Sequence, residues 1–158
     1  MDRQKPIGIF DSGIGGLTVL NELKKILPHE NFIYYADTKH LPYGDKTKEE
    51  IISYSKYIVE YFIKNDVKAI IIACGTASAL AFETLKKDYN IPIFNVIDST
   101  INHLNINNIG IIATCASIKS NVWDNKILKK LPNANITKVA CPKLVPLAEN
   151  DLINTAES

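Results

Sequence analysis

Short apolar runs alternate with longer stretches of helical period along almost the whole chain, and this alternation limits the fold more than any other feature. The runs are rich in β-branched residues and apolar on both faces, as strands of a covered parallel sheet are. They cover residues 7–10, 31–36, 67–73, 91–96, 108–113 and 136–140. The pattern predicts an α/β fold, a layered parallel-type sheet with flanking helices.

The segments between these runs predict four helices. The clearest covers residues 48–64, where Ile51, Ile58 and Phe62 recur near the helical period, and Thr47 with Glu50 forms a capping box at its start. The other three cover residues 17–27, 76–89 and 117–131.

With 158 residues, the chain is long enough for one sizeable core but short for two complete domains. A short polar stretch at residues 98–107 is the best candidate for a boundary. We therefore expect a first α/β lobe over residues 1–98, with Asp11 and Cys74, and an incomplete second lobe over residues 99–158.

The net charge of +1 gives little attraction for a polyanion. Arg3 is the single arginine among 18 basic residues, and the lysines are scattered among 17 acidic residues, so a basic patch is not expected. No apolar run approaches the ~20 residues of a membrane span, and the first residues lack the apolar core of a signal peptide. We expect a cytoplasmic protein with no nucleic-acid or membrane partner.

Three cysteines, Cys74, Cys115 and Cys141, form neither a CxxC pair nor the spacing of a metal site. Their odd number argues against a disulfide framework. The sequence therefore predicts reduced thiols and no metal. It leaves the oligomeric state open, with a homodimer among the candidates.

Small polar residues, glycines and a thiol follow the predicted strands. The segments that carry them are residues 11–16, 37–38, 42–44, 74–76 and 114–115. In open α/β folds the ligand binds at the carboxyl ends of the strands. The convergence of these segments on one rim predicts a small-molecule site there.

Several familiar site types are excluded by single residues. The segment DSGIGG is not a dinucleotide fingerprint because Thr18 stands where a third glycine is needed, and no Gly-Lys-Ser/Thr follows for a P-loop. Its glycines otherwise indicate a turn with positive φ and close helix packing. Cys74 lacks the nearby arginine of a cysteine phosphatase, and Phe10 breaks the G-x-S-x-G pattern that Ser12 would need as a hydrolase nucleophile.

Cys74 lies where a buried strand gives way to a helix. The plain interpretation is a small buried hydrophobe. The alternative is a reactive thiolate, stabilised by backbone N–H groups at the helix start that lower its pKa from about 8.5. Gly75 leaves room for a ligand beside the backbone. Without a metal or cofactor motif, such a thiolate suits proton abstraction beside a carboxylate, or acyl transfer.

Three segments in order carry a family resemblance: GIFDSGIGGLTVLNELKKILPHENFIYYADTKHLPYGDKTKEEI, AIIIACGTASALA and ACPKLVPLAEN. Together they resemble the cofactor-independent glutamate racemases, in which DSGxGG, DT-x(3)-PYG and AC-x-TA occur at this spacing. The resemblance implies interconversion of L- and D-glutamate without a cofactor, through proton abstraction by a thiolate, and supply of D-glutamate for peptidoglycan of the bacterial cell wall.

The resemblance also assigns roles to residues. Cys74 matches the first catalytic cysteine, Asp11 the aspartate that assists it, and Glu149 a glutamate that assists proton transfer. Substrate contacts are implied for Asp11, Ser12, Tyr43, Gly44, Gly75 and Thr76. Thr114 and Ser117 fall in the family's threonine-rich substrate loop.

Two departures from the family pattern bear on function. Gly75 stands where many relatives have asparagine. The family's Gly-Cys-Thr-His-Tyr-Pro segment, with the second catalytic cysteine, is absent, so a C-terminally truncated form is expected. Cys141 lies in a non-catalytic family context, and Cys115 is a conceivable stand-in. The alternative to a racemase is a non-catalytic fragment that binds glutamate or a partner at most.

Overall fold

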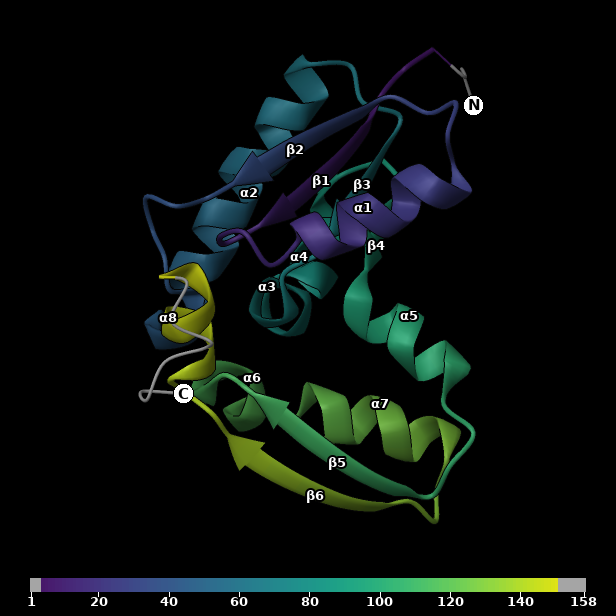
Figure 1. Ribbon diagram of the computed structural model, residues 1–158, viewed down its shortest axis with the longest axis vertical. Coiled ribbons are helices and arrows are strands. Elements are labelled where there is room, and N and C mark those ends of the chain that lie inside the picture. Colours follow the sequence, from purple (N-terminus) through teal and green to yellow (C-terminus); the bar gives the residue numbers. More distant parts are fainter. Residues whose placement is uncertain (1–3, 151–158) are drawn as a thin grey trace.

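The computed structural model describes residues 4–150. Its larger sheet has four parallel strands in the order β2-β1-β3-β4 (Figure 1). The strands are β1 (Ile7–Asp11), β2 (Phe32–Ala36), β3 (Ala69–Ile72) and β4 (Ile93–Asn95). Parallel strands buried under helices explain the near-continuous apolar runs in the sequence. The prediction of an α/β fold with a parallel sheet is confirmed.

One face of this sheet is covered by α2 (Lys48–Lys64), α3 (Gly75–Leu80) and α4 (Phe82–Asp88). Phe10, Ile70 and Ile72 of the strands form a buried cluster with side chains of these helices. The first helix, α1 (Leu17–Ile26), crosses the sheet on the near side in Figure 1.

The prediction for α2 is confirmed in full. Thr47 Oγ1 accepts a hydrogen bond from Glu50 N at 3.2 Å, and Thr47 N donates to Glu50 Oε2 at 2.8 Å. These two bonds satisfy donors that the start of a helix leaves unpaired. Burial of Ile58, Val59 and Phe62 then anchors the helix on the sheet.

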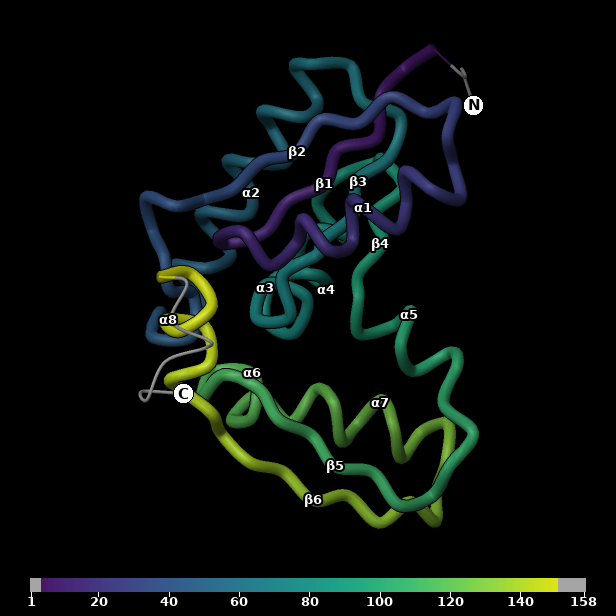
Figure 2. The backbone as a smooth tube through the Cα atoms, viewed as in Figure 1, coloured from purple at the N-terminus to yellow at the C-terminus, as the bar shows by residue number. Residues whose placement is uncertain are grey.

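A second sheet holds the parallel strands β5 (Asn108–Ala113) and β6 (Asn135–Ala140). They are joined through α6 (Cys115–Lys119) and α7 (Val122–Lys130), and β6 is followed by α8 (Leu144–Glu149). A separate apolar cluster, built on Ile111 and Ile127, packs α7 on one face of this sheet. The chain passes from the first sheet to the second through α5 (Val96–His103) (Figure 2).

The sequence pattern does not predict helix α5, because the polar residues of 98–107 indicate a break. Asn95 caps the helix through a 2.9 Å bond from Asp98 N, and Ile97 and Ile101 are buried in the second cluster. Two apolar residues one turn apart are too few to stand out among polar neighbours. The division into lobes at residue 98 stays a prediction.

Four other elements differ from the prediction. The helix expected at 76–89 is two helices that meet at Ala81, and the one expected at 117–131 is interrupted at Asn121, which has a φ of 53°. The short elements α8 and η1 (Tyr43–Asp45) were not foreseen. Within residues 4–150, no helix has both the length and the hydrophobicity needed to cross a bilayer.

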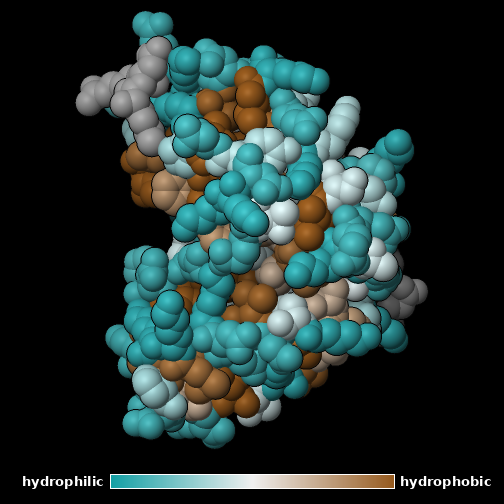
Figure 3. Space-filling model, turned by 180° about the vertical axis from the view of Figure 1, so that it is seen from behind, coloured by the Kyte–Doolittle hydropathy of each residue, from teal (hydrophilic) through white to brown (hydrophobic). Residues whose placement is uncertain are grey.

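The second sheet leaves apolar side chains in solvent on the face away from α7. Ile112 and Val139 are paired across the two strands and are 68% and 51% exposed. Hydrophobic surface also reaches the outside at the lower end of the molecule in Figure 3, the end at which β5 and β6 lie in Figure 1. An exposed apolar face of a parallel sheet is unusual, since such sheets are normally covered on both faces.

This exposed pair predicts dye binding. The double variant Ile112→Thr/Val139→Thr should bind a hydrophobic dye several-fold more weakly, while its melting temperature stays within a few degrees, because exposed substitutions usually change stability by about 0.5 kcal/mol or less. Dye fluorescence and thermal melts check this. Ile106→Thr, which removes an isolated exposed isoleucine, is the control, and an equal loss of dye binding in that variant would contradict the prediction.

Candidate active site

A cavity of about 370 Å³ lies where the ends of both sheets meet. Its walls come from the ends of β1 and β5, from the segments that follow β1, β3, β5 and β6, and from α7 and α8. The polar side chains in its lining are Asp11, Ser12, Cys74, Thr76, Thr114, Ser117, Cys141 and Glu149. Of the predicted segments, those at 11–16, 74–76 and 114–115 contribute to this lining, whereas residues 37–38 and 42–44 do not.

Cys74 is the N-cap residue of α3 and is 4% exposed. Its Sγ accepts a hydrogen bond from Ala77 N at 3.4 Å and lies 3.7 Å from Ser12 Oγ. The sulfur therefore sits at the helix start, as the sequence indicated, and faces the cavity beside a hydroxyl group.

The pKa of Cys74 differs from the prediction. Burial of the thiol, followed by the charge of Asp11, raises its pKa from 9.0 to about 11. The hydrogen bonds from Ala77 N and from Ser12 act in the opposite direction but are outweighed. The expected lowering was wrong because the sequence does not show how deeply the sulfur is buried or that a carboxylate lies nearby.

Asp11 is held at the end of β1 by the loop that follows it. Its Oδ2 accepts a hydrogen bond from Gly16 N at 2.8 Å. A Cβ on Gly16 would lie within 3.0 Å of Asp11, Tyr34 and Ala73. The glycines of DSGIGG therefore serve close packing, as predicted, but no glycine of residues 4–150 has a positive φ, so the predicted turn conformation was wrong.

Glu149 reaches this loop from the far end of the described chain. Its Oε1 accepts a hydrogen bond from Ile14 N at 2.8 Å. Gly13 makes room for it, since a Cβ there would lie 2.0 Å from Glu149 Oε1. A second carboxylate is thereby fixed in the cavity wall, on the side of α8.

Three hydroxyl groups join the two sheets across the cavity. Thr76 Oγ1 lies 2.9 Å from Thr114 Oγ1, which donates to Ser117 Oγ at 3.1 Å. Thr114 also caps α6 by accepting from Ser117 N at 3.3 Å. We call these three side chains the hydroxyl cluster. Neutral donors of this kind can bind a carboxylate of a ligand.

Tyr43 and Gly44, which the resemblance links to the substrate, are not in the lining of the cavity. The Tyr43 hydroxyl donates to Asp37 Oδ2 at 2.6 Å, and the ring is 1% exposed. Burial, then the hydrogen bond with Asp37, raises the pKa of Tyr43, so its phenol keeps its proton. Gly44 packs on Thr114, since a Cβ there would lie 2.9 Å from Thr114 Cβ.

Other residues complete the comparison with the sequence. Gly75 has open space at its Cα, as expected. Trp123 and Cys141 line the cavity, although no pattern in the sequence marked Trp123, whereas Cys115 is not in the lining. In the described part of the chain, no lysine or arginine contributes to the lining. Among residues 4–150, no group of three or more histidine, cysteine or acidic side chains could hold a metal ion.

Known proteins of one kind match this sequence and this fold. A glutamate racemase from Trichodesmium erythraeum is 44% identical over 154 residues, which cover 96% of this chain and 57% of the relative. One from Streptococcus thermophilus is 38% identical, with 96% and 58% covered. The solved glutamate racemase of Francisella tularensis, in complex with D-glutamate, superposes with a TM-score of 0.92 at 38% identity, with 98% and 60% covered.

The chain is a homologue of the glutamate racemases. The resemblance inferred from three sequence segments is thereby confirmed. The homologue spans about three-fifths of the length of the relatives that it matches. No protein-family model matches it.

The glycines of the site predict a contrast in stability. Gly16→Ala should lower the free energy of unfolding by about 1–3 kcal/mol, because its methyl group overpacks against Asp11 and Ala73. Gly75→Ala should not lower it, because nothing lies within 4 Å of the added atom. Urea unfolding of both variants checks this, and equal losses would contradict the packing argument.

The environment of Cys74 predicts its titration. The thiolate should form only as the pH approaches about 11, measured as the difference in thiolate absorbance between the wild-type chain and Cys74→Ser. Folding favours the neutral thiol, and this contribution of Cys74 to the free energy of unfolding is fully present below the unfolded pKa of about 8.5. It is lost as the pH rises through the folded pKa of about 11. A midpoint at or below about 8.5 would contradict this prediction.

Proposed function

We propose that this chain binds glutamate in the cavity and that Cys74 abstracts the α-proton, as the first base of a glutamate racemase. The observation that carries the proposal is the position of the Cys74 sulfur, which faces a cavity lined by two carboxylates and the hydroxyl cluster. The homologues support the substrate class, since the Francisella tularensis racemase is solved with D-glutamate.

The charges of the lining fit an amino acid. Asp11 and Glu149 provide a place for the α-ammonium group, and the hydroxyls of Thr76, Thr114 and Ser117 can donate to a carboxylate. Open space at Gly75 lets the ligand approach the backbone at the start of α3. Carboxylate binding through neutral donors suits a lining to which residues 4–150 contribute no lysine or arginine.

Base strength follows from the same geometry. A thiolate whose conjugate thiol has a pKa of about 11 is a stronger base than one at 9.0. The higher value narrows the difference between the pKa of the thiol and that of the α-carbon. The cost is that less thiolate is present at neutral pH. An ammonium group bound near Asp11 offsets the second cause of the raised pKa, the Asp11 charge, so substrate binding itself promotes ionisation of Cys74.

Inversion needs a second acid on the opposite face of the carbanion, because one thiol cannot reach both faces of a fixed substrate. The family resemblance assigns no such role to Cys115 or Cys141. The chain is therefore proposed to exchange the α-proton of one enantiomer faster than it inverts glutamate. Supply of D-glutamate to peptidoglycan, and a cytoplasmic location, belong to this proposal on the family resemblance alone.

The role of Cys74 predicts loss of exchange. Cys74→Ser should lower the rate of α-proton exchange by about 10²-fold or more, because a serine hydroxyl is a far weaker acid-base group in this position. Deuterium incorporation into L- and D-glutamate in D₂O, followed by proton NMR, measures the rate. Cys115→Ser, outside the lining, is the matched control.

The outcomes separate the candidate functions. Equal loss in both variants would refute the assignment of Cys74. Binding without exchange, seen as a glutamate-dependent change in the fluorescence of Trp123, the single tryptophan, would favour the non-catalytic alternative. Inversion as fast as exchange would contradict the one-sided chemistry.

A further inference from the structure

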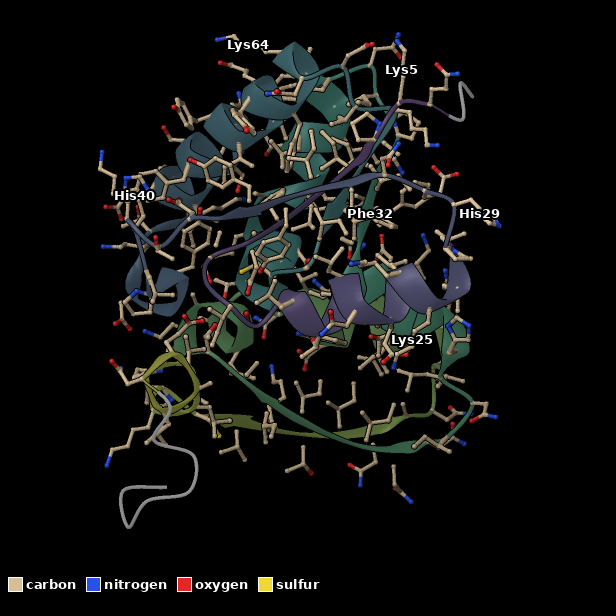
Figure 4. All side chains as sticks on the ribbon, turned by 45° about the horizontal axis from the view of Figure 1, so that its top comes forward. Lys5, Lys25, His29, Phe32, His40 and Lys64 are labelled. Carbon is tan, nitrogen blue, oxygen red and sulfur yellow. The ribbon has the colours of Figure 1, made fainter. Side chains whose placement is uncertain are left out.

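A chain of side-chain contacts runs from the protein surface to the hydroxyl cluster. It begins at His40, in the loop after β2, passes through the buried carboxylate of Asp37 to Tyr43, and continues through Gly44 to Thr114. Each link is a hydrogen bond or a close packing contact. Figure 4 shows His40 at the edge of the molecule, on the opposite side from His29, which precedes β2.

His40 is fixed on two sides. Its ring stacks on Tyr54 of α2, with centroids 3.9 Å apart and planes inclined by 9°. Its Nδ1 lies 2.8 Å and 2.9 Å from the two oxygens of Asp37. Because an ionised carboxylate only accepts hydrogen bonds, Nδ1 carries the proton in this pair.

Asp37 needs both of its partners. Its side chain is only 7% exposed, and its carboxylate receives hydrogen bonds from His40 and from the Tyr43 hydroxyl. A buried carboxylate that loses one of two donors must turn toward another donor or admit water. Either change moves the acceptor that holds Tyr43.

Tyr43 in turn fixes the segment that supports the cavity wall. Its carbonyl accepts from Lys46 N at 3.2 Å, which closes η1, and Gly44 in this turn packs against Thr114. Thr114 is the centre of the hydroxyl cluster, with bonds to Thr76 and Ser117. The orientation of these hydroxyls therefore depends on where η1 sits.

We propose that His40 is a positioning residue for the glutamate site: through Asp37 and Tyr43, it holds η1 against Thr114 and so orients the hydroxyl cluster. The inference rests on the proposed function for its effect on glutamate, but its structural part is independent of any activity. The role belongs to the Nδ1–H group rather than to the bulk of the ring, and this separates it from simple packing.

Two variants separate the two contacts of His40. His40→Phe keeps a ring to stack on Tyr54 but removes the donor, whereas His40→Asn keeps a side-chain N–H near the position of Nδ1 but removes the stack. Hydrogen exchange followed by mass spectrometry reads the backbone at residues 43–46 and 114–118. In His40→Phe, exchange in both segments should rise about tenfold, the effect of losing a hydrogen bond to a buried charged group.

His40→Asn should restore most of the protection, and His29→Phe, which changes an exposed histidine at the other end of β2, should have no effect. Circular dichroism identifies a variant that does not fold. If His40→Phe does not fold, Tyr43→Phe takes its place, because it removes the other hydrogen-bond donor to Asp37. The same rise in hydrogen exchange is then expected. Unchanged exchange in His40→Phe or Tyr43→Phe, or equal increases in His40→Phe and His40→Asn, would overturn the proposal.

The effect on the ligand is measured separately. Titration of L- and D-glutamate, followed by Trp123 fluorescence, should show affinity about tenfold weaker in His40→Phe than in His40→Asn. Absence of glutamate binding by the wild-type chain would defeat the proposed function, while hydrogen exchange would still decide the role of His40. Weakened binding in both variants to the same extent would count against the Nδ1–H group.

Discussion

The central position of β1 in the first sheet sets the geometry on which the site depends. Its register pairs Asp11 with Ala36 and Phe10 with Ile72, so three parallel strands end at one level. The ladder continues past the strands, because Asp37 N donates to Asp11 O and Ala73 N donates to Phe10 O, both at 2.9 Å. A slip of one residue would turn Asp11 to the other face of the sheet. The side chains that follow these strands meet because the register requires it.

The same register creates a conflict at Cys74. Burial at a strand end protects the thiol from water and gives a strong base, yet it opposes the charge that a base must carry. Neighbouring donors at Ala77 and Ser12 favour that charge, but the nearby carboxylate of Asp11 does not. A cationic ligand shifts the balance between the thiol and the thiolate more than a fixed donor can. Its positive charge is present only while the ligand, and therefore the proton to be abstracted, is bound. The environment is thus better suited to the bound state than to the empty one.

Sequence patterns predicted the parts of the fold that depend on local chemistry. The capping box and the apolar period defined α2 to the residue, and the rule for parallel strands placed Asp11, Cys74 and Thr114 on one rim. Features that depend on burial or on distant contacts were missed. Helix α5 is stabilised by a cluster formed with α7, and the pKa of Cys74 is set by depth. The contact of Glu149 with Ile14 spans 135 positions, so only family resemblance could suggest that Glu149 belongs to the site. The pair of Asp37 and His40 lies in an irregular loop, where spacing carries no signal.

Polar contacts link the walls of the cavity directly, while Ala79 of α3 and Gly44 of η1 add packing contacts between the two halves of the structure. The two apolar clusters share no buried residue. Across the cavity, the sheets are linked by the bond between Thr76 and Thr114 on one side and by that between Glu149 and Ile14 on another. Hydrogen bonds of this kind contribute only about 1 kcal/mol each. They therefore hold the two walls at a fixed distance less firmly than packing holds the strands and helices of either sheet. A ligand that bonds to both walls would add contacts between them, and such contacts favour the arrangement in which they form. Under the proposed function, a bound amino acid would therefore link the two sheets as well as react, and the contacts that run from His40 to Thr114 would limit how far one wall can move before it binds.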